Sequence, residues 1–218
     1  MSSYRGKRLL DLAISVPGLL LTFPAQAAIA MMVAIKLGRP ILFRQIRPGL
    51  GGRPFELIKF RTMQPIDNAR GLIDDESRMT AFGRSLRASS LDELPSLWNV
   101  VRGDMSIVGP RPLLMQYLNR YTASQARRHD VKPGITGLAQ VSGRNGISWS
   151  EKFALDVKYV QEQSLSSDIR ILGRTILSVL RRENVNSLGQ ATTTEFLGCA
   201  DLGPLTIEEY PPLCRSSK

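Results

Sequence analysis

The sequence has few of the residues that build disulfide scaffolds, zinc sites or base-stacking surfaces. Its 218 residues include two cysteines, Cys199 and Cys214, and one histidine, His129. No C-x-x-C pair is present, and these three residues match no familiar zinc spacing. We interpret the cysteines as reduced thiols of a cytosol-facing protein, with one disulfide between them as the alternative. Aromatic residues make up 6% of the chain, which is few for a protein that stacks single-stranded bases.

Acidic residues are also in short supply relative to basic ones. The chain has 29 Lys and Arg against 19 Asp and Glu, a formal net charge of +10. Such a surface attracts anions, namely nucleic acid, anionic lipid head groups or phosphorylated substrates. Because aromatics are scarce and the N-terminus is apolar, we expect anionic membrane lipids and phosphorylated substrates as partners and no nucleic acid. The length fits one domain of ordinary size with an appended element.

An uncharged apolar segment runs from Leu12 to Ile35. A straight helix of this length would extend roughly 36 Å, enough to cross a ~30 Å hydrocarbon core. Pro24 lies at its middle, where it removes a backbone donor and predicts a kink or break. Each arm around Pro24 would then be about 18 Å long, roughly half a bilayer.

Basic residues flank both ends of this segment: Arg5, Lys7 and Arg8 before it, and Lys36, Arg39, Arg44, Arg47 and Arg53 after it. The positive-inside rule would keep both clusters on the cytoplasmic side of the membrane. A re-entrant helix–break–helix satisfies this condition, whereas a crossing helix would leave one of the two basic clusters on the outer side of the membrane. A kinked span is one alternative, and a cleaved signal peptide with an A-x-A match at Ala25-Gln26-Ala27 is another.

The rest of the chain predicts an α+β fold that is mostly helical with a small β-hairpin. We expect three units: the re-entrant segment with its basic flanks (1–37), a catalytic domain with interfacial helices (38–194) and a loosely ordered tail (195–218). The patterns predict a hairpin over Ile41–Met63, a polar loop over 64–79, a strand over Leu138–Val141, and helices over Phe82–Ala88, from about Leu94 to Gly103, and over Leu113–Arg128, Trp149–Gln163 and Asp168–Arg182.

Asp92 and Glu93 stand at the start of an amphipathic helix, where the helix dipole is positive. Ser90 and Glu93 match an S-x-x-E capping box, the structural explanation for Glu93. Alternatively Pro95 is the first helical residue, and both carboxylates lie just outside the helix. Adjacent residues do not share a helical face, so we expect the two carboxylates to have different roles.

Several basic residues are candidates for binding phosphate. Lys59 and Arg61 share one face of the second hairpin strand, which is also how charged residues protect a strand edge. Arg111 lies between two prolines that fix its backbone, and arginine suits bidentate phosphate contact. Glycine-rich loops at 132–137 and 142–146, the second with Arg144, either cradle a nucleotide or simply turn. Asp156 has an ordinary explanation as an i,i+4 partner of Lys152.

Several motifs then follow one another in a fixed order. They are Arg47-Pro48-Gly49, Lys59-Phe60-Arg61-Thr62-Met63, Ser90-Leu91-Asp92-Glu93-Leu94-Pro95-Ser96-Leu97-Trp98-Asn99-Val100, Gly103-Asp104-Met105-Ser106-Ile107-Val108-Gly109-Pro110-Arg111-Pro112, Pro133-Gly134-Ile135-Thr136-Gly137, Gly143-Arg144-Asn145 and Phe153-Ala154-Leu155-Asp156-Val157-Lys158-Tyr159-Val160. From about Lys7 to Thr194 the chain closely resembles the bacterial sugar transferases known as monotopic phosphoglycosyl transferases, in their short form.

The resemblance implies a re-entrant helix that does not cross the bilayer, on the cytoplasmic face of the bacterial inner membrane. It also implies transfer of a sugar 1-phosphate from a UDP-sugar to polyprenyl phosphate, with UMP released and Mg²⁺ required. A homodimer is one assembly that we consider. Many members have Ser-Pro at the helix break where this chain has Phe23-Pro24, which puts the break angle in question. The alternative function is a catalytically silent membrane-anchored protein that binds nucleotide sugars or anionic lipids.

By position, the resemblance makes Asp92 the covalent nucleophile. Glu93 then holds Mg²⁺ or deprotonates the incoming phosphate, and Asp92 is a second candidate ligand of the metal. The residues expected to bind substrate phosphate or to support its binding are Lys59, Arg61, Arg87, Arg111, Arg144 and Asp156.

Overall fold

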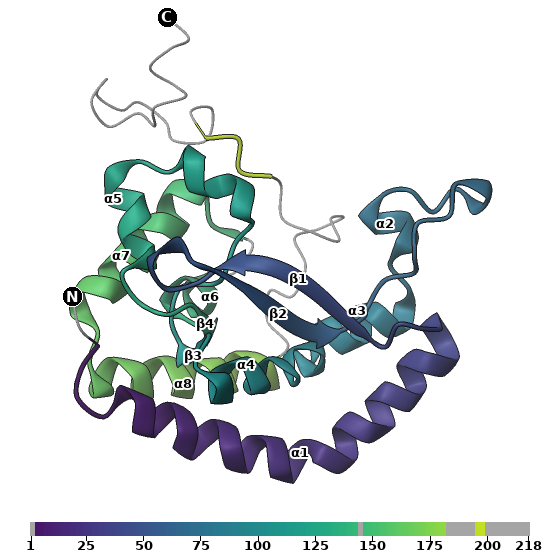
Figure 1. Ribbon diagram of the computed structural model, residues 1–218, viewed down its shortest axis with the longest axis horizontal. Coiled ribbons are helices and arrows are strands. Elements are labelled where there is room, and N and C mark those ends of the chain that lie inside the picture. The colour runs from purple at the N-terminus through teal and green to yellow at the C-terminus, as the bar shows by residue number, and fades with distance from the viewer. Residues whose placement is uncertain (1–2, 144–145, 182–194, 199–218) are drawn as a thin grey trace, which may run out of the picture.

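The computed structural model describes residues 3–143, 146–181 and 195–198, and it is mostly helical (Figure 1). The helices are α1 (Lys7–Leu37), α2 (Asp75–Arg78), α3 (Ala81–Ala88), α4 (Ser96–Arg102), α5 (Ala123–Ala126), α6 (Leu138–Ser142), α7 (Trp149–Glu162) and α8 (Leu165–Leu180). The strands are β1 (Leu42–Pro48), β2 (Pro54–Phe60), β3 (Ser106–Val108) and β4 (Gly134–Thr136). The expected mixture of many helices and few strands is confirmed.

Strands β1 and β2 form the antiparallel hairpin that the sequence predicts, with Leu42 opposite Phe60. The turn between them contains Gly51 and Gly52, whose φ angles of 62° and 74° are left-handed and suit a residue without a Cβ atom. Strands β3 and β4 pair in parallel and form a second, separate sheet. Both sheets are small, so most of the chain packs as helices around them.

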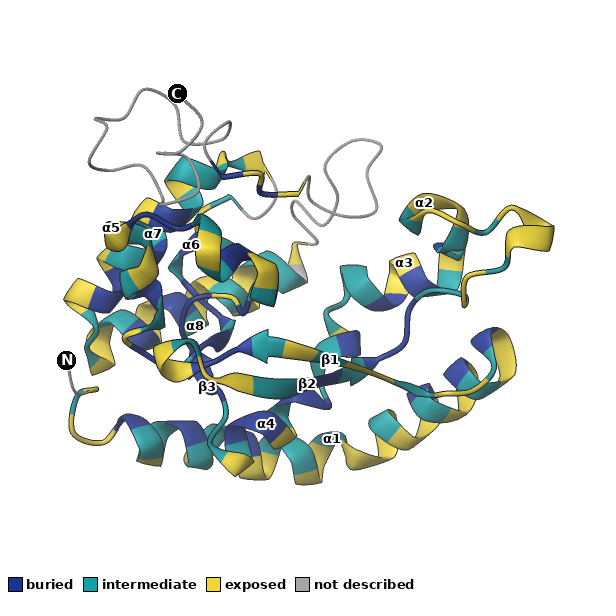
Figure 2. Cartoon of the chain, turned by 45° about the horizontal axis from the view of Figure 1, so that its top comes forward, coloured by how far each residue is buried: buried dark blue, intermediate teal, exposed yellow. Residues whose placement is uncertain are grey.

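Helix α1 follows one long edge of the molecule and bends along its length (Figures 1 and 2). It continues through Pro17 and Pro24 without interruption, so the expected break at Pro24 is corrected to a bend within one helix. A proline removes one backbone hydrogen bond and bends a helix, but both arms here pack against the rest of the chain and stay helical. Thr22 Oγ1 also donates to the Gly18 carbonyl oxygen at 2.6 Å, a type of contact that bends helices.

The inner face of α1 is polar in its first half. Lys7, Asp11 and Ser15, which are spaced one turn apart, are all buried. Asp11 Oδ1 accepts hydrogen bonds from Ser106 Oγ at 2.8 Å and from the Ile107 N–H at 2.9 Å. The first half of α1 is therefore fixed to the start of β3 by hydrogen bonds, and Ile14 adds apolar packing against the buried cluster that contains Val100 and Met105.

The second half of α1 packs through apolar side chains. Ile29, Val33 and Leu37 form a buried cluster with Phe60 of β2 and Leu86 of α3. The outer face of α1 exposes a row of large apolar side chains: Leu9, Val16, Leu20, Leu21, Phe23, Met31, Met32 and Ile35. Within the described residues, α1 alone is long and apolar enough to cross a membrane.

Lys7 connects α1 to α8 and β3 through buried polar groups. Its Nζ lies 2.6 Å from Asp168 Oδ2 and donates to the Val108 carbonyl oxygen at 3.0 Å. Asp168 is fully buried and also accepts hydrogen bonds from the hydroxyls of Tyr4 and Tyr159, each at 2.8 Å. A buried ion pair resists separation when its remaining hydrogen-bonding capacity is satisfied in this way.

Two other elements differ from the sequence predictions. Instead of one helix over Leu113–Arg128, the chain has a 3-10 helix at Met115–Arg120, then α5 and a final 3-10 turn. Thr122 starts α5 with a capping box to Gln125, which is a signal for a new helix that the periodicity concealed. The predicted strand over Leu138–Val141 is helix α6, because a run of four residues, three of them apolar, does not separate helix from strand. The expected loop over 64–79 is a loop with a 3-10 turn and α2.

Replacing Asp168 by alanine tests how firmly α1 is held. The change removes the closest partner of the buried Lys7 charge and leaves only Asp11, at 3.9 Å, to offset it, at a cost of about 3–5 kcal/mol. In a chain of this size, that lowers the apparent Tm by roughly 6–20 °C. Thermal unfolding in detergent measures the effect, with the exposed Glu162→Gln as the control. Adding Lys7→Met to Asp168→Ala should restore part of the loss, and an unchanged Tm in Asp168→Ala would contradict this account.

Candidate active site

Asp92 and Glu93 lie in a single 3-10 turn, Leu91–Glu93, between α3 and α4. Ser90 precedes this turn with a φ of 56°, and no other non-glycine residue in the described part of the chain has a positive φ. A left-handed backbone costs such a residue roughly 1–2 kcal/mol, and strain of this kind concentrates at functional sites. The Ser90 side chain makes no capping hydrogen bond, so the predicted capping box with Glu93 is wrong.

Helix α4, which follows the pair, is fastened to the free edge of β2 by two polar side chains. Asn99 accepts from the Ile58 N–H at 3.1 Å and donates to the Glu56 carbonyl oxygen at 2.7 Å. Ser96 Oγ donates to the Ile58 carbonyl oxygen at 2.8 Å. These bonds take the place of a third strand, so the position of the Asp92–Glu93 turn is fixed relative to β2.

The amphipathic helix predicted from about Leu94 is confirmed as α4, and two of its polar side chains, Ser96 and Asn99, are buried. Ser96 and Asn99 are covered by β2, whereas Trp98 of the apolar stripe is 51% exposed. Leu97 of the same stripe lies beside Gly18 of α1. Apolar periodicity located the helix but could not show that its polar residues complete the edge of a strand.

Glu93 is held by two cations that come from different parts of the chain. Lys59 Nζ of β2 donates to Glu93 Oε1 at 2.7 Å, and Arg111 Nη2 lies 3.1 Å from the same oxygen. Burial alone would raise the pKa of Glu93, but the charges of Lys59 and Arg111 outweigh it and hold this pKa well below its usual range. Glu93 is therefore ionised at neutral pH.

Asp92 is more deeply buried than Glu93, with 8% of its surface exposed. Burial and the adjacent charge of Glu93 raise its pKa from 3.8 to about 6, against the opposing effect of Lys59, Arg111 and Arg87. Among the described residues, no donor makes a hydrogen bond or ion pair with the Asp92 carboxylate. The two neighbours therefore have different surroundings, because Glu93 is neutralised by cations and Asp92 keeps its oxygen lone pairs available; their different roles stay a prediction.

Arg111 is positioned through its backbone. Its carbonyl oxygen accepts a hydrogen bond from Arg128 Nη2 at 2.7 Å. Two residues earlier, a Cβ atom on Gly109 would lie 2.4 Å from the Lys132 carbonyl oxygen, so the loop fits only with glycine at that position. The Arg111 side chain is 49% exposed and extends from this fixed loop to Glu93.

Two more arginines adjoin this group. Arg87, at the end of α3, donates from Nε to Thr62 Oγ1 at 3.0 Å, and burial lowers its pKa while the charge of Asp92 opposes that shift. Arg47 was not among the predicted site residues, although it opens one of the quoted motifs. Burial, followed by the charge of Arg111, lowers the pKa of Arg47 to about 10. Its Nη1 donates to the Pro112 carbonyl oxygen at 3.5 Å.

The remaining predicted residues lie elsewhere or outside the description. Arg61 donates to the carbonyl oxygens of Leu37, Gly38 and Arg39 at the end of α1, so it caps that helix. Asp156 pairs with Arg128 at 2.7 Å rather than with Lys152, and both members of the pair are buried. It therefore acts on the site through the arginine that holds the Arg111 loop. Arg144 lies outside the described residues.

Together these side chains suit a polyanionic substrate. Lys59, Arg87 and Arg111 outnumber the two carboxylates, and their positions are fixed before a ligand arrives. No group of three or more His, Cys, Asp or Glu side chains in the described parts of the chain could hold a metal ion alone. Mg²⁺, however, is usually held by one or two carboxylates together with substrate phosphates and water. Asp92 and Glu93 fit that donor chemistry.

Comparison with known proteins gives consistent matches. The model of the family described as bacterial sugar transferase matches residues 2–182. The chain is 49% identical over 197 residues to the uncharacterized sugar transferase EpsL of Bacillus subtilis, covering 90% of this chain and 98% of that protein. It is 40% identical over 189 residues to UDP-glucose:undecaprenyl-phosphate glucose-1-phosphate transferase of Caulobacter vibrioides (82% and 71% covered). It is 37% identical over 195 residues to undecaprenyl-phosphate galactose phosphotransferase of Salmonella typhimurium (81% and 41% covered).

The charge distribution predicts an unusual titration of Asp92. In metal-free protein its carboxyl should release its proton near pH 6, so it is protonated below that pH and ionised above it. Glu93→Gln removes the neighbouring anion and should lower this pKa, whereas Lys59→Met removes a cation and should raise it. Carbon-13 NMR of aspartate-labelled protein, with Asp92→Asn to assign the signal, measures both shifts. Titration of Asp92 at or below pH 4 would contradict the electrostatics described.

Proposed function

The chain belongs to the bacterial sugar transferase family, and from this membership we propose that it is a phosphoglycosyl transferase that moves a sugar 1-phosphate from a UDP-sugar to undecaprenyl phosphate. Two relatives carry this type of reaction in their names, one with glucose and one with galactose. The observation that carries the proposal is the Asp92 carboxylate, which has no hydrogen-bonding partner among the described residues and stands beside a Glu93 already neutralised by Lys59 and Arg111.

The reaction is proposed to pass through a covalent intermediate on Asp92. A carboxylate oxygen of Asp92 attacks the phosphorus that carries the sugar, and the bond between this phosphorus and the bridging oxygen breaks. UMP leaves with that oxygen, and the sugar phosphate remains on Asp92 as an acyl phosphate. An oxygen of undecaprenyl phosphate then attacks the same phosphorus, which releases the Asp92 carboxylate and forms the lipid diphosphate sugar.

The proposed first step brings a carboxylate to a diphosphate, so both reactants are negatively charged. Arg111 is well placed to contact the diphosphate because its side chain is half exposed on a fixed loop. Arg87 approaches from α3 on the Asp92 side, and Lys59 offsets the charge of Glu93. Cations fixed before the substrate arrives stabilise developing charge without reorganising during the reaction.

Mg²⁺ is proposed as the metal, with Glu93 and Asp92 as its protein ligands. When bound, such an ion supplies charge neutralisation at the phosphate oxygens. Of the two roles considered for Glu93, metal binding is favoured over proton abstraction. A carboxylate whose pKa is well below the usual range is a weak base, so Glu93 is poorly suited to accept a proton.

We further propose that the enzyme sits in one leaflet at the cytoplasmic face of the membrane. The first end of α1 binds Asp168 and Val108, and the other packs on Phe60 and Leu86, so both ends attach to the same globular body. A crossing helix about 46 Å long would carry part of that body into the hydrocarbon core. The exposed apolar side chains on the outer face of α1, with Ile169, Ile176 and Leu177 on α8, are suited to contact lipid.

Labelling with a membrane-impermeant maleimide tests this topology. Cys199 and Cys214 are replaced by serine, and single cysteines are placed on either side of α1 as Ser3→Cys or Arg53→Cys. Both positions should react in inside-out membrane vesicles and neither in intact spheroplasts, because both ends of α1 are proposed to face the cytoplasm. Labelling of one position from each side would mean that α1 crosses the bilayer.

Release of UMP tests the reaction itself. Detergent-solubilised protein with Mg²⁺, undecaprenyl phosphate and either UDP-glucose or UDP-galactose should release UMP with at least one donor. Asp92→Asn should lower the rate about a thousandfold or more, because it removes the nucleophile. The exposed Asp130→Asn is the matched control and should keep the rate of the unaltered enzyme. Equal rates in Asp92→Asn and the control would refute the nucleophile assignment, and silence with a wider panel of UDP-sugars would favour a binding protein.

A further inference from the structure

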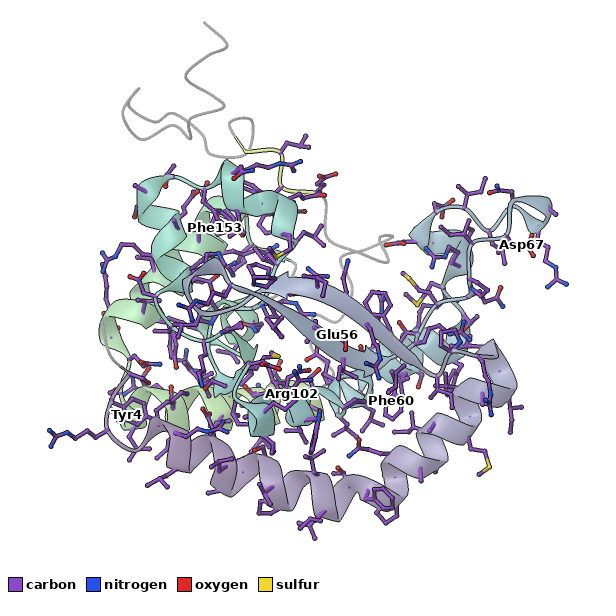
Figure 3. All side chains as sticks on the ribbon, viewed as in Figure 1. Tyr4, Glu56, Phe60, Asp67, Arg102 and Phe153 are labelled. Carbon is purple, nitrogen blue, oxygen red and sulfur yellow. The ribbon has the colours of Figure 1, made fainter. Side chains whose placement is uncertain are left out.

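A cluster of aromatic side chains includes two tyrosines from the segment that follows the Arg111 loop. Tyr117 and Tyr121 from the segment after that loop face Trp149 and Phe153 of α7, and Phe196 fills the space between them. The Phe196 ring centroid is 4.9 Å from that of Phe153, 5.6 Å from Tyr117, 5.5 Å from Trp149 and 6.0 Å from Tyr121. Figure 3 shows Phe153 on the side of the molecule where the segment 195–198 lies. We call these four rings the aromatic pocket.

The segment that carries Phe196 is also bound through polar groups. The Phe196 N–H donates to the Tyr117 hydroxyl at 3.1 Å, and Arg120 Nη1 donates to the Phe196 carbonyl oxygen. Glu195 Oε1 accepts from Gln116 Nε2 at 2.6 Å and pairs with Arg120 Nη1 at 2.9 Å. The Phe196 ring, the Phe196 backbone and the Glu195 carboxylate thus all contact the rest of the chain, and Phe196 is fully buried. This segment begins the predicted loosely ordered tail, whose later residues lie outside the description.

The aromatic pocket shares two of its walls with the arginine that holds Arg111. The Arg128 guanidinium lies 5.7 Å from the ring centroids of both Tyr121 and Phe153. Its Nη1 donates to the Tyr121 hydroxyl at 3.3 Å, and its Nε and Nη2 donate to Asp156 at 3.0 and 2.7 Å. The same Nη2 donates to the Arg111 carbonyl oxygen at 2.7 Å. A continuous series of contacts therefore runs from Phe196 through Arg128 to Arg111 and Glu93.

We propose that Phe196 is a positioning residue for Arg111. By filling the aromatic pocket, it keeps water away from the Arg128–Asp156 pair, which lets Arg128 hold the Arg111 carbonyl oxygen in one place. The inference rests on the proposed function, in which Arg111 contacts the donor diphosphate. Without the Phe196 ring, the aromatic pocket contains an unfilled space that water can enter. Water then competes for the hydrogen bonds of Arg128, and the Arg111 loop is held less firmly.

Two measurements on the full-length enzyme test this role. In Phe196→Ala, amide hydrogen exchange in the segment that includes Gly109 and Arg111 should become faster, because the loop opens more often. The KM for the UDP-sugar should rise about tenfold, the effect of losing one well-placed charge-assisted contact, while the KM for undecaprenyl phosphate stays unchanged. The matched control is Leu197→Ala, which truncates the neighbouring exposed side chain and should alter neither quantity. Phe196→Leu should give a smaller effect in the same direction, and it remains informative if Phe196→Ala fails to fold.

A double-mutant cycle separates positioning from general destabilisation. If Phe196 acts through Arg111, Phe196→Ala should change the donor KM by less than about twofold in an Arg111→Ala background. Equal effects of Phe196→Ala in the two backgrounds, or unchanged hydrogen exchange in the Arg111 segment, would overturn the inference. Faster exchange in a protein that never releases UMP would instead uphold the positioning role and reject the proposed reaction.

Discussion

The arrangement of the site depends on the neutralisation of Glu93 by Lys59 and Arg111. Two adjacent carboxylates in a half-buried turn repel each other, and removing each charge from water costs several kcal/mol. Cations at 2.7 and 3.1 Å from one Glu93 oxygen offset this penalty and keep Glu93 ionised. Asp92 is left with a raised pKa and without a partner among the described residues. A carboxylate with a raised pKa and no hydrogen-bonding partner is suited to attack a phosphorus centre whose charge is offset by nearby cations.

Much of the fold serves to bring these few groups together. Lys59 comes from β2, Arg87 from α3, and Arg111 from the loop after β3, so their meeting depends on contacts between elements distant in sequence. Asn99 and Ser96 fix α4, and with it the carboxylate turn, to the edge of β2. Helix α1 lies under the same assembly, with its polar half on β3 and α8 and its apolar half on β2 and α3. The proposed attachment to the membrane and the alignment of the site thus share one framework, which would place the proposed chemistry near the lipid head groups.

The sequence predicted those features that depend on local signals. The hairpin and the helices α3, α7 and α8 follow from periodicity and turn glycines. The order of the motifs identified the family and drew attention to Asp92, Glu93, Lys59 and Arg111. Local signals failed where tertiary contacts decide the outcome. A proline at position 24 predicted a break, but packing of both arms keeps α1 continuous, and Arg61 turned out to cap the end of α1. The roles of Asn99, Ser96 and Arg128 depend on partners 17 to 43 positions away, which no window along the chain reveals.

The central claim is that Asp92 carries the sugar phosphate between donor and acceptor. The most direct measurement is the intact mass of the enzyme after incubation with Mg²⁺ and UDP-sugar, without undecaprenyl phosphate, followed by peptide mapping. The account predicts an adduct of one sugar phosphate on the peptide that contains Asp92, which disappears when undecaprenyl phosphate is added and never forms in Asp92→Asn. The claim would be contradicted if the enzyme turns over but no adduct can be trapped within a single turnover. An adduct on another residue would also contradict the claim.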